Sequence, residues 1–361
     1  MTTTIKDRPI DKTDTGAISL LTRLLEHYSP SREEAGVAAF LVETMTSLGF
    51  EAHLDSVGNA IGEMGSGERT LLLLGHMDTV PGYIPVRREG DRLHGRGAVD
   101  AKGPLATFIM ATARARPLPG LRVVVAGAVE EEAATSKGAY HLVRGPRPDY
   151  VIIGEPGGWS RITMGYKGRL LVDYTATRPA SHTAGPHRSV AEVAVDFWKG
   201  IEALASDHNE GKEGIFNTLD PSLRRFNTVE SGFDQSAELT IGLRLPPGID
   251  ICALQRQIEL VAVAGTVSFR GAEEPFRAPK NTPLTRAFLI AIRAQGGRPT
   301  FVVKTGTSDM NVVGPRWQCP VVAYGPGDSS LDHTPDEHIE ISEYLRGINV
   351  LAHALRELAQ L

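Results

Sequence analysis

The chain has 361 residues, more than one ordinary compact core holds, so we expect two domains. Its composition is that of a globular protein, and its net charge of −5 argues against a general attraction to nucleic acid. Its two cysteines, Cys252 and Cys319, stand far apart, which argues against a disulfide framework and a thiolate metal site and is typical of a reducing cytoplasm. With no signal-like N-terminus and no run of eighteen apolar residues, we expect a cytoplasmic protein without a membrane partner.

The first half of the chain alternates expected helices with short apolar strands. Apolar residues recur at helical spacing over 14–28, and a second helix is expected over 32–48, with Ser31 and Glu34 as a capping box and Gly49 just after its end. Strands are expected at TLLLLG, LRVVVAGAV and YVIIG, and a helix at AKGPLATFIMATARAR. Continuous apolar runs of this kind occur in sheets covered on both faces, so this part predicts an α/β layer.

The pattern changes near residue 166. RLLVDYTATR alternates apolar and polar residues, and the segments after it predict the order β-α-β-β-α-β, a ferredoxin-like pattern over 166–272. Apolar runs typical of buried elements appear again later in the chain, in NTPLTRAFLIAIRAQGG, TFVVKTG and CPVVAYGPG. The last element expected is an amphipathic helix. We therefore predict one α/β domain made of residues 1–165 and 273–361, with a small α+β domain inserted between them.

Side chains that bind metal ions stand where the expected strands end. They are His76 and Asp78 after LLLLG, Asp100 at the end of HGRGAVD, Glu130, Glu131 and Glu132 after VVVAGAV, Glu155 after VIIG, and His333 in LDHTPDEH. In open α/β sheets, ligands bind outside the carboxyl ends of the strands. Carboxylates and imidazoles that converge there suit a divalent ion such as zinc or cobalt.

Each of these residues also has an ordinary structural interpretation. A histidine and an aspartate two residues apart can form a hydrogen-bonded pair, and three glutamates in a row are typical of a solvated turn. Asp100 can cap the following helix, Glu155 can belong to a turn before Pro156, and His333 can be structural. Their joint occurrence at strand ends and in Gly/Pro loops favours the metal site.

The motifs GHMDTVP, GRGAVDAKGPLA, VEEEAATSKGA, GEPGG and HTPDEH, in this order, resemble those of the dinuclear zinc aminoacylase and carboxypeptidase family. The resemblance spans the chain and implies a zinc-peptidase-like catalytic domain, with a mixed sheet covered by helices, and an inserted ferredoxin-like lid and dimerisation domain. It implies amide hydrolysis with two divalent ions per chain, Zn²⁺ or else Co²⁺. Within the family, GYKGRL and GTSDMNVV are most similar to hydrolases that release lysine or ornithine from the acidic amino-group carrier protein LysW.

The resemblance implies two metal sites that share the carboxylate of Asp100. One site is completed by His76 and Glu155, and the other by Glu132 and His333. The two ions would flank the water that attacks the amide.

Two further residues would support this centre. Asp78 matches the carboxylate that hydrogen-bonds a ligand histidine and fixes its tautomer. Aligned from the preceding strand, Glu131 is the general base and Glu132 the ligand. Because the gap to Gly138 is longer than in most relatives, a shifted alternative stays open, with Glu130 as base and Glu131 as ligand.

Two residues of the inserted domain match substrate contacts of the family. His182 in ASHTAGP matches a lid histidine that donates to the oxyanion, often across a dimer, although Ser189 and Ala191 stand where relatives often carry Gly and Asn. Arg244 in GLRLPPG matches a lid arginine that grips a carboxylate. An exposed loop histidine and a surface strand arginine are the alternatives.

Further substrate contacts are expected from Ser308, Asp309 and Lys167. Asp309 in GTSDMN suits a cationic amine such as that of lysine, and a helix cap is an equally natural role for this loop. Residues 161–190 carry Arg161, Lys167, Arg169, Arg178 and Arg188 against the single acid Asp173. This excess predicts a basic face that steers an acidic carrier; a solvated face is the alternative.

The leading hypothesis is a homodimeric metal-dependent hydrolase of lysine and arginine biosynthesis that frees lysine or ornithine from LysW. The alternatives are a small-molecule N-acyl amino acid deacylase, of the acetylornithine or succinyl-diaminopimelate type, and a dipeptidase. A non-catalytic binding protein on the same scaffold is disfavoured, because every ligand position is filled.

Overall fold

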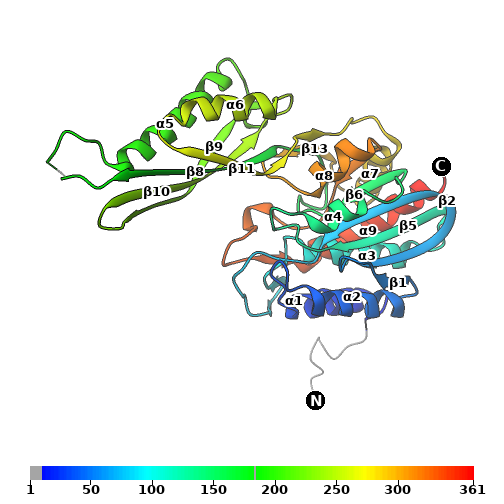
Figure 1. Cartoon of the computed structure of the whole chain (residues 1–361). Coiled ribbons are helices and arrows are strands. Elements are labelled where there is room, and N and C mark those ends of the chain that lie inside the picture. The colour runs from blue at the N-terminus through cyan, green and yellow to red at the C-terminus, as the bar shows by residue number, and fades with distance from the viewer. Residues whose placement is uncertain (1–9, 183) are drawn as a thin grey trace. The chain divides into compact units, whose positions relative to one another are not determined.

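The computed structural model describes residues 10–182 and 184–361. Residues 1–9 and Thr183 of the ASHTAGP motif lie outside the described residues. The chain divides into two compact units, and we describe each by itself (Figure 1). Unit 1 comprises Met1–Gly165, Ala278–Val303 and Ser308–Leu361, and unit 2 comprises Tyr166–Arg277 and Lys304–Thr307.

Unit 1 is built on a mixed sheet. Its strands are β1 (Glu51–Leu54), β2 (Ala60–His76), β5 (Pro119–Ala128), β6 (Tyr150–Ile153), β7 (Arg161–Tyr166), β13 (Thr300–Lys304) and β14 (Val321–Ala323). The long strand β2 pairs in parallel with β5 and β6, and antiparallel with β1. β14 is parallel to β6 and antiparallel to β7. The parallel strands β2, β5 and β6 therefore deliver their carboxyl ends to one edge, where His76, the glutamates after β5 and Glu155 follow.

Helices cover this sheet. They are α1 (Asp14–Glu26), α2 (Ala35–Ser47), α3 (Lys102–Ala115), α4 (Lys137–Leu142), α7 (Pro283–Ala294), α8 (Asp309–Trp317) and α9 (Ile341–Ala359). Leu41 of α2 and Leu105 of α3 meet at Gly127, where an added Cβ would lie only 3.3 Å from each of the two side chains. A small separate sheet is formed by β3 (Arg87–Glu89), β4 (Arg92–His94) and β15 (His338–Glu340). Across residues 10–182 and 184–361, we find no helix with the length and apolar character needed to cross a membrane.

The start of α2 differs from the prediction. The helix begins at Ala35 rather than near residue 32, and Glu34 at its N-cap makes no side-chain cap. The capping box of Ser31 and Glu34 is therefore wrong. Both side chains instead bind residues far away in the sequence, so tertiary contacts override the local pattern. The other end agrees: Gly49 follows the C-cap with φ +91°, a conformation that glycine adopts readily.

Unit 2 shows the expected order of elements, namely β8 (Gly168–Pro179), α5 (Val190–Asn209), β9 (Asp220–Glu230), β10 (Asp234–Leu245), α6 (Ile251–Val261) and β11 (Thr266–Glu273), with a short 3₁₀ turn at Ile215–Asn217. The strands pair antiparallel in the order β11-β8-β10-β9, and α5 and α6 lie on one face of this sheet (Figure 1). Tyr174 stacks on Phe197 in the core between the sheet and these two helices. The short strand β12 (Phe276–Arg277) follows where the chain leaves the unit.

Candidate active site

His76 ends β2 and is almost fully buried. Its Nδ1 lies 3.0 Å from the backbone carbonyl oxygen of Asp78 and 3.4 Å from the Asp78 carboxylate. Its Nε2 lies 3.2 Å from Oδ1 of Asp100. A ring that donates through Nδ1 keeps its Nε2 lone pair for a ligand, so the end of the apolar strand holds an imidazole in an orientation that suits metal binding.

Asp100 lies between two histidines. Its Oδ1 faces His76, and its Oδ2 lies 3.0 Å from Nε2 of His333. Burial favours the neutral carboxyl, but these two imidazoles lower the pKa of Asp100 below its ordinary value. The helix-cap alternative is wrong, because the N-cap of α3 is Ala101 and no side chain caps it. One carboxylate that faces two imidazoles with different oxygens has the arrangement of a bridging ligand.

His333 joins this pair to Glu132. Its Nε2 lies 2.9 Å from Oε1 of Glu132, and its hydrogen bonds with Asp100 and Glu132 raise the pKa of His333 to about 10. The residue has φ +61°, in the left-handed region that non-glycine residues adopt rarely. Such conformations concentrate at functional sites, where the surrounding structure enforces them.

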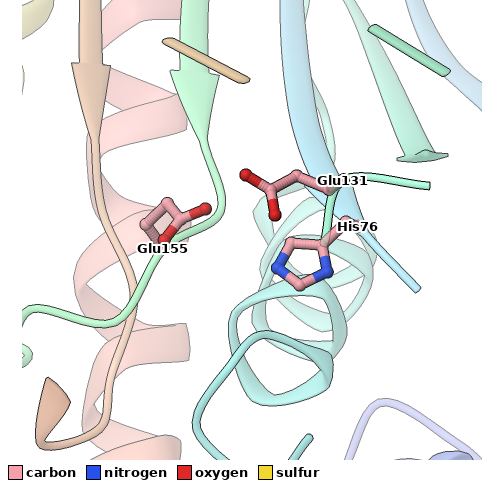
Figure 2. A group of neighbouring side chains, drawn as sticks. All are labelled: His76, Glu131 and Glu155. Atoms are coloured by element: carbon pink, nitrogen blue, oxygen red, sulfur yellow. The ribbon is translucent and has the colours of Figure 1, made fainter. Parts of the chain in front are cut away.

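Glu131 and Glu155 follow β5 and β6, the strands that pair with β2 on either side, and approach His76 at the end of β2, as Figure 2 shows. Ligand atoms of these three residues lie within 4.8 Å of one another, as do those of a second group, His76 with Asp100 and Glu132. Within the described residues, the expected trio of His76, Asp100 and Glu155 does not form one such group. The reason is geometric, since the Asp100 carboxylate is held between His76 and His333 while Glu155 lies in the group of Glu131.

The carboxylates repel one another, which makes the centre suitable for cations. Burial raises the pKa of Glu131 well above its ordinary value against the opposing effect of His76, and the charges of Glu155, Asp309 and Glu132 raise it further. Burial and Asp100 likewise raise the pKa of Glu132, against the hydrogen bond from His333. Clustered carboxylate oxygens with imidazole nitrogens are the donor set that zinc and cobalt accept, so the residues present fit divalent ions.

The structure separates the three consecutive glutamates. Glu130 has φ +57°, and its side chain accepts a hydrogen bond from Thr135 at 2.7 Å and pairs with Lys137 at 3.7 Å. The backbone N–H groups of Glu131 and Glu132 donate to the two oxygens of Asp78, at 3.1 Å and 3.0 Å. Glu131 and Glu132, and not Glu130, therefore belong to the groups around His76, and the assignment of base and ligand within the turn remains a prediction.

Sequence reasoning missed a buried ion pair beneath this site. Oε1 of Glu337 accepts the backbone N–H groups of Val99 at 2.9 Å and Asp100 at 3.1 Å, and its Oε2 pairs with Arg96 at 2.8 Å. Arg96 also donates to the carbonyl oxygen of Gly82 at 2.9 Å. Glu337 thus anchors the loop that presents Asp100. The available signal was its place in HTPDEH, four residues after His333.

Ser308 and Asp309 take different roles. Ser308 is the N-cap of α8 and forms a capping box with Asn311, so the helix-cap alternative applies to it. Asp309 follows in the first turn, is 3% exposed, and lies close enough to raise the pKa of Glu131. Of the two, only Asp309 is shown to act electrostatically on the site.

Lys167 lies in a buried hydrogen-bond network of unit 2. Its side chain is fully buried in unit 2, and its ammonium donates to the carbonyl oxygen of Ile215 at 2.8 Å, to that of Thr218 and to the carboxylate of Asp220. A lysine held in this way contributes no exposed charge to a basic face, and its predicted substrate contact remains a prediction. Counting charges along the chain does not reveal that a charge is buried against its own partners.

The predicted substrate contacts Arg244 and His182 of unit 2 are exposed. Arg244 on β10 donates from Nη1 to Oγ1 of Thr307 at 2.5 Å. Nδ1 of His182 accepts the backbone N–H of Ala184 at 3.1 Å. Arg188 of the expected basic face is paired with Asp196. The roles predicted for Arg244 and His182 remain predictions.

Comparisons with known proteins identify the family. Residues 72–357 match the model described as peptidase family M20/M25/M40. The LysW-lysine hydrolase of Deinococcus radiodurans is 48% identical over 338 residues, which cover 91% of this chain and 93% of that protein. A putative LysW-lysine/LysW-ornithine hydrolase of Pyrococcus furiosus is 43% identical over 342 residues, 95% of this chain and 97% of that protein.

Solved structures confirm the predicted fold. A metallo-carboxypeptidase of the M20 family from Sulfolobus solfataricus superposes with a TM-score of 0.80 at 19% identity, covering 96% of this chain and 99% of that one. A dinuclear metal-binding peptidase of the M20 family from Bacillus subtilis gives 0.65 at 13% identity, over 96% and 98% of the two chains. The family match and the named hydrolases confirm the predicted class of enzyme. The chain therefore belongs to peptidase family M20/M25/M40.

Proposed function

We propose that this protein is a two-metal amide hydrolase that releases lysine or ornithine from an amino-group carrier protein of the LysW kind. One observation carries the proposal. Imidazole and carboxylate side chains converge at the ends of parallel strands, in a chain that is 48% identical over 91% of its length to a LysW-lysine hydrolase. Each side chain of that convergence has a role in amide hydrolysis.

Two ions would share Asp100, because its two oxygens face His76 and His333 separately. Glu155 would complete the site of His76, and Glu132 that of His333. Mixed nitrogen and oxygen donors suit Zn²⁺, with Co²⁺ as the alternative. Ions held there supply Lewis acidity toward water and toward the amide carbonyl.

Glu131 is the proposed general base. It takes a proton from the attacking water and passes it to the amide nitrogen, so that a C–O bond forms while the C–N bond breaks. The carrier side keeps a carboxylate and the amino acid leaves with a free amine. Burial raises the pKa of Glu131, and a carboxylate with a raised pKa is a stronger base.

Asp309 is the proposed partner of the lysine or ornithine side-chain amine. It is a buried acid that acts electrostatically on Glu131, and pairing with a cationic substrate would offset that repulsion. His182 is proposed to stabilise the oxyanion, and Arg244 to grip the carboxylate of the amino acid. The exposure of both side chains in unit 2 leaves them available for these contacts.

A homodimer through unit 2 is also proposed. Strand β9 is an edge of its sheet and exposes apolar side chains, with Leu223 39%, Phe226 43% and Val229 54% accessible. A long edge strand with apolar side chains is a surface that natural proteins protect by pairing or covering. A second copy of the chain would cover it.

The test compares substrates on one zinc-loaded or cobalt-loaded preparation. Carrier-linked lysine, carrier-linked ornithine, acetylornithine and succinyl-diaminopimelate are supplied, and the released amino acid is quantified by mass spectrometry. We expect kcat/KM to be largest for a carrier-linked substrate. A larger value for either small molecule would instead establish the deacylase alternative, and hydrolysis of none would contradict the proposal and support a dipeptidase or a binding protein.

A further inference from the structure

We propose that the segment 29–34 sets which two of the three consecutive glutamates face the metal centre, with Ser31 and Glu34 as its positioning residues. The inference rests on the proposed function, since it assigns these residues to the same site. Three glutamates in a row offer the same chemistry at each position. Something outside the turn must therefore select the register.

Glu34 holds the first peptide of the turn. Its side chain is buried at 6% exposure, and Oε1 accepts the backbone N–H of Glu130 at 3.1 Å and that of Arg32 at 2.8 Å. The accepted N–H belongs to the residue with φ +57°. A left-handed glutamate persists only where surrounding contacts enforce it, and Glu34 supplies one of them.

The same segment helps to keep the Glu130 side chain apart from the site. Nε of Arg32 lies 3.8 Å from Oε2 of Glu130, beside the contacts with Thr135 and Lys137. Arg32 itself has φ +80°, and its backbone is tied to Glu34. The backbone and the carboxylate of Glu130 are thus both engaged by residues 32–34.

Ser31 acts on the other two glutamates through Asp78. Its hydroxyl donates to Oδ2 of Asp78 at 2.7 Å, the oxygen that also accepts from the backbone N–H of Glu132. Ser29 adds a bond from its hydroxyl to the carbonyl oxygen of Met77 at 2.7 Å. The segment therefore fixes the carboxylate to which the Glu131 and Glu132 peptides are aligned.

Two matched pairs of variants test this inference. Glu34→Ala removes the acceptor, whereas Glu34→Gln keeps an oxygen that can accept both N–H groups. Ser31→Ala removes the donor, whereas Ser31→Thr keeps a hydroxyl. Thr112→Ala deletes another buried hydroxyl, which bonds the carbonyl oxygen of Phe108 within α3, and serves as the control for a general loss of stability.

The readouts are Co²⁺ affinity by chelator competition, the visible spectrum of the Co²⁺-loaded protein, and kcat and KM. We expect both alanine variants to bind at least one Co²⁺ about 10- to 100-fold more weakly, with an altered spectrum and a lower kcat. The glutamine and threonine variants should retain wild-type affinity and spectrum, as should Thr112→Ala. If Glu34→Ala does not fold, the comparison of Ser31→Ala with Ser31→Thr tests the inference.

The choice of which two glutamates face the metal centre is tested directly by combining Glu130→Gln with the wild-type and Glu34→Ala proteins. In the wild-type background this change should leave Co²⁺ binding unaltered, and in the Glu34→Ala background it should change both the residual affinity and the spectrum, because Glu130 then reaches the centre. Folded alanine variants with wild-type Co²⁺ affinity and spectrum would overturn the inference, as would additive double mutants. These readouts need no carrier, so a wild-type protein that binds Co²⁺ but leaves carrier-linked lysine intact defeats the proposed function alone.

Discussion

The two carboxylate oxygens of Asp78 accept the consecutive backbone N–H groups of Glu131 and Glu132, at 3.1 Å and 3.0 Å. The same residue offers its main-chain carbonyl oxygen to Nδ1 of His76. Asp78 thus orients an imidazole and aligns the glutamate turn together. The Asp78 carboxylate, which is predicted to hydrogen-bond a ligand histidine, lies 3.4 Å from Nδ1 of His76, so the main-chain carbonyl oxygen is the nearer partner and the predicted role of the carboxylate remains a prediction.

The shared ligand can be tested through metal content. Asp100→Ala should remove both ions, because the carboxylate between His76 and His333 would belong to both coordination shells. Metal per folded chain is measured by elemental analysis after gel filtration, with Asp336→Ala, an exposed acid of the same motif as His333, as the control. One tightly held ion in folded Asp100→Ala would contradict the bridging role.

The general base can be separated from its neighbours by amide substitutions. Glu131→Gln should keep near-normal metal content and lower kcat by about 10²-fold or more, the usual contribution of a general base. Glu132→Gln should instead weaken one metal site. Glu130→Gln should be close to wild type in both respects, because its side chain is bound to Thr135 and Lys137. A metallated but inactive Glu130→Gln would show that the shifted register operates.

The residues of the site could largely be predicted from the sequence because each proposed ligand ends an apolar strand or lies in a Gly/Pro loop. That relation between strand ends and ligands depends on local pattern and general topology alone. The supporting contacts could not be predicted in the same way. Glu34 and Glu130 stand 96 positions apart, and Glu337 and Asp100 stand 237 apart, so no local pattern reports their hydrogen bonds.

Removing the metal should destabilise unit 1. Besides burial, the charges of neighbouring carboxylates raise the pKa of Glu131 and of Glu132, and divalent ions would neutralise these charges. Ligands that bind only the folded state stabilise it by about 2.7 kcal/mol at one hundred times their dissociation constant. We expect the melting temperature to fall on chelation and to recover on addition of Zn²⁺ or Co²⁺. A melting temperature that does not respond to either treatment would argue against metal binding at the site.

Substitution of Lys167 tests whether this residue stabilises the fold or contacts the substrate. Lys167→Ala leaves Asp220 and two carbonyl oxygens without their buried donor, so the free energy of unfolding should fall by about 2 kcal/mol or more. At a temperature where the variant is folded, kcat/KM for carrier-linked lysine should stay near wild type. Lys199→Ala, an exposed cation of α5, is the control for charge alone. A loss of kcat/KM without a loss of stability would support the predicted substrate contact.

The dimer and the role of His182 are best tested together. Phe226→Glu places a charge among the exposed apolar side chains of the edge strand β9. If a second copy covers this strand, the charge would lose its water, which is costly. Light scattering should show twice the chain mass for wild type and a single chain mass for Phe226→Glu. Glu238→Gln, which removes an exposed charge on β10, is the control.

His182→Ala should lower kcat more than it raises KM, since an oxyanion donor acts in the transition state. If His182 acts across the dimer, Phe226→Glu should lose kcat to the same extent, and a mixture of Phe226→Glu with His182→Ala should gain none. A monomeric Phe226→Glu protein with wild-type kcat would leave His182 no role in the partner's site.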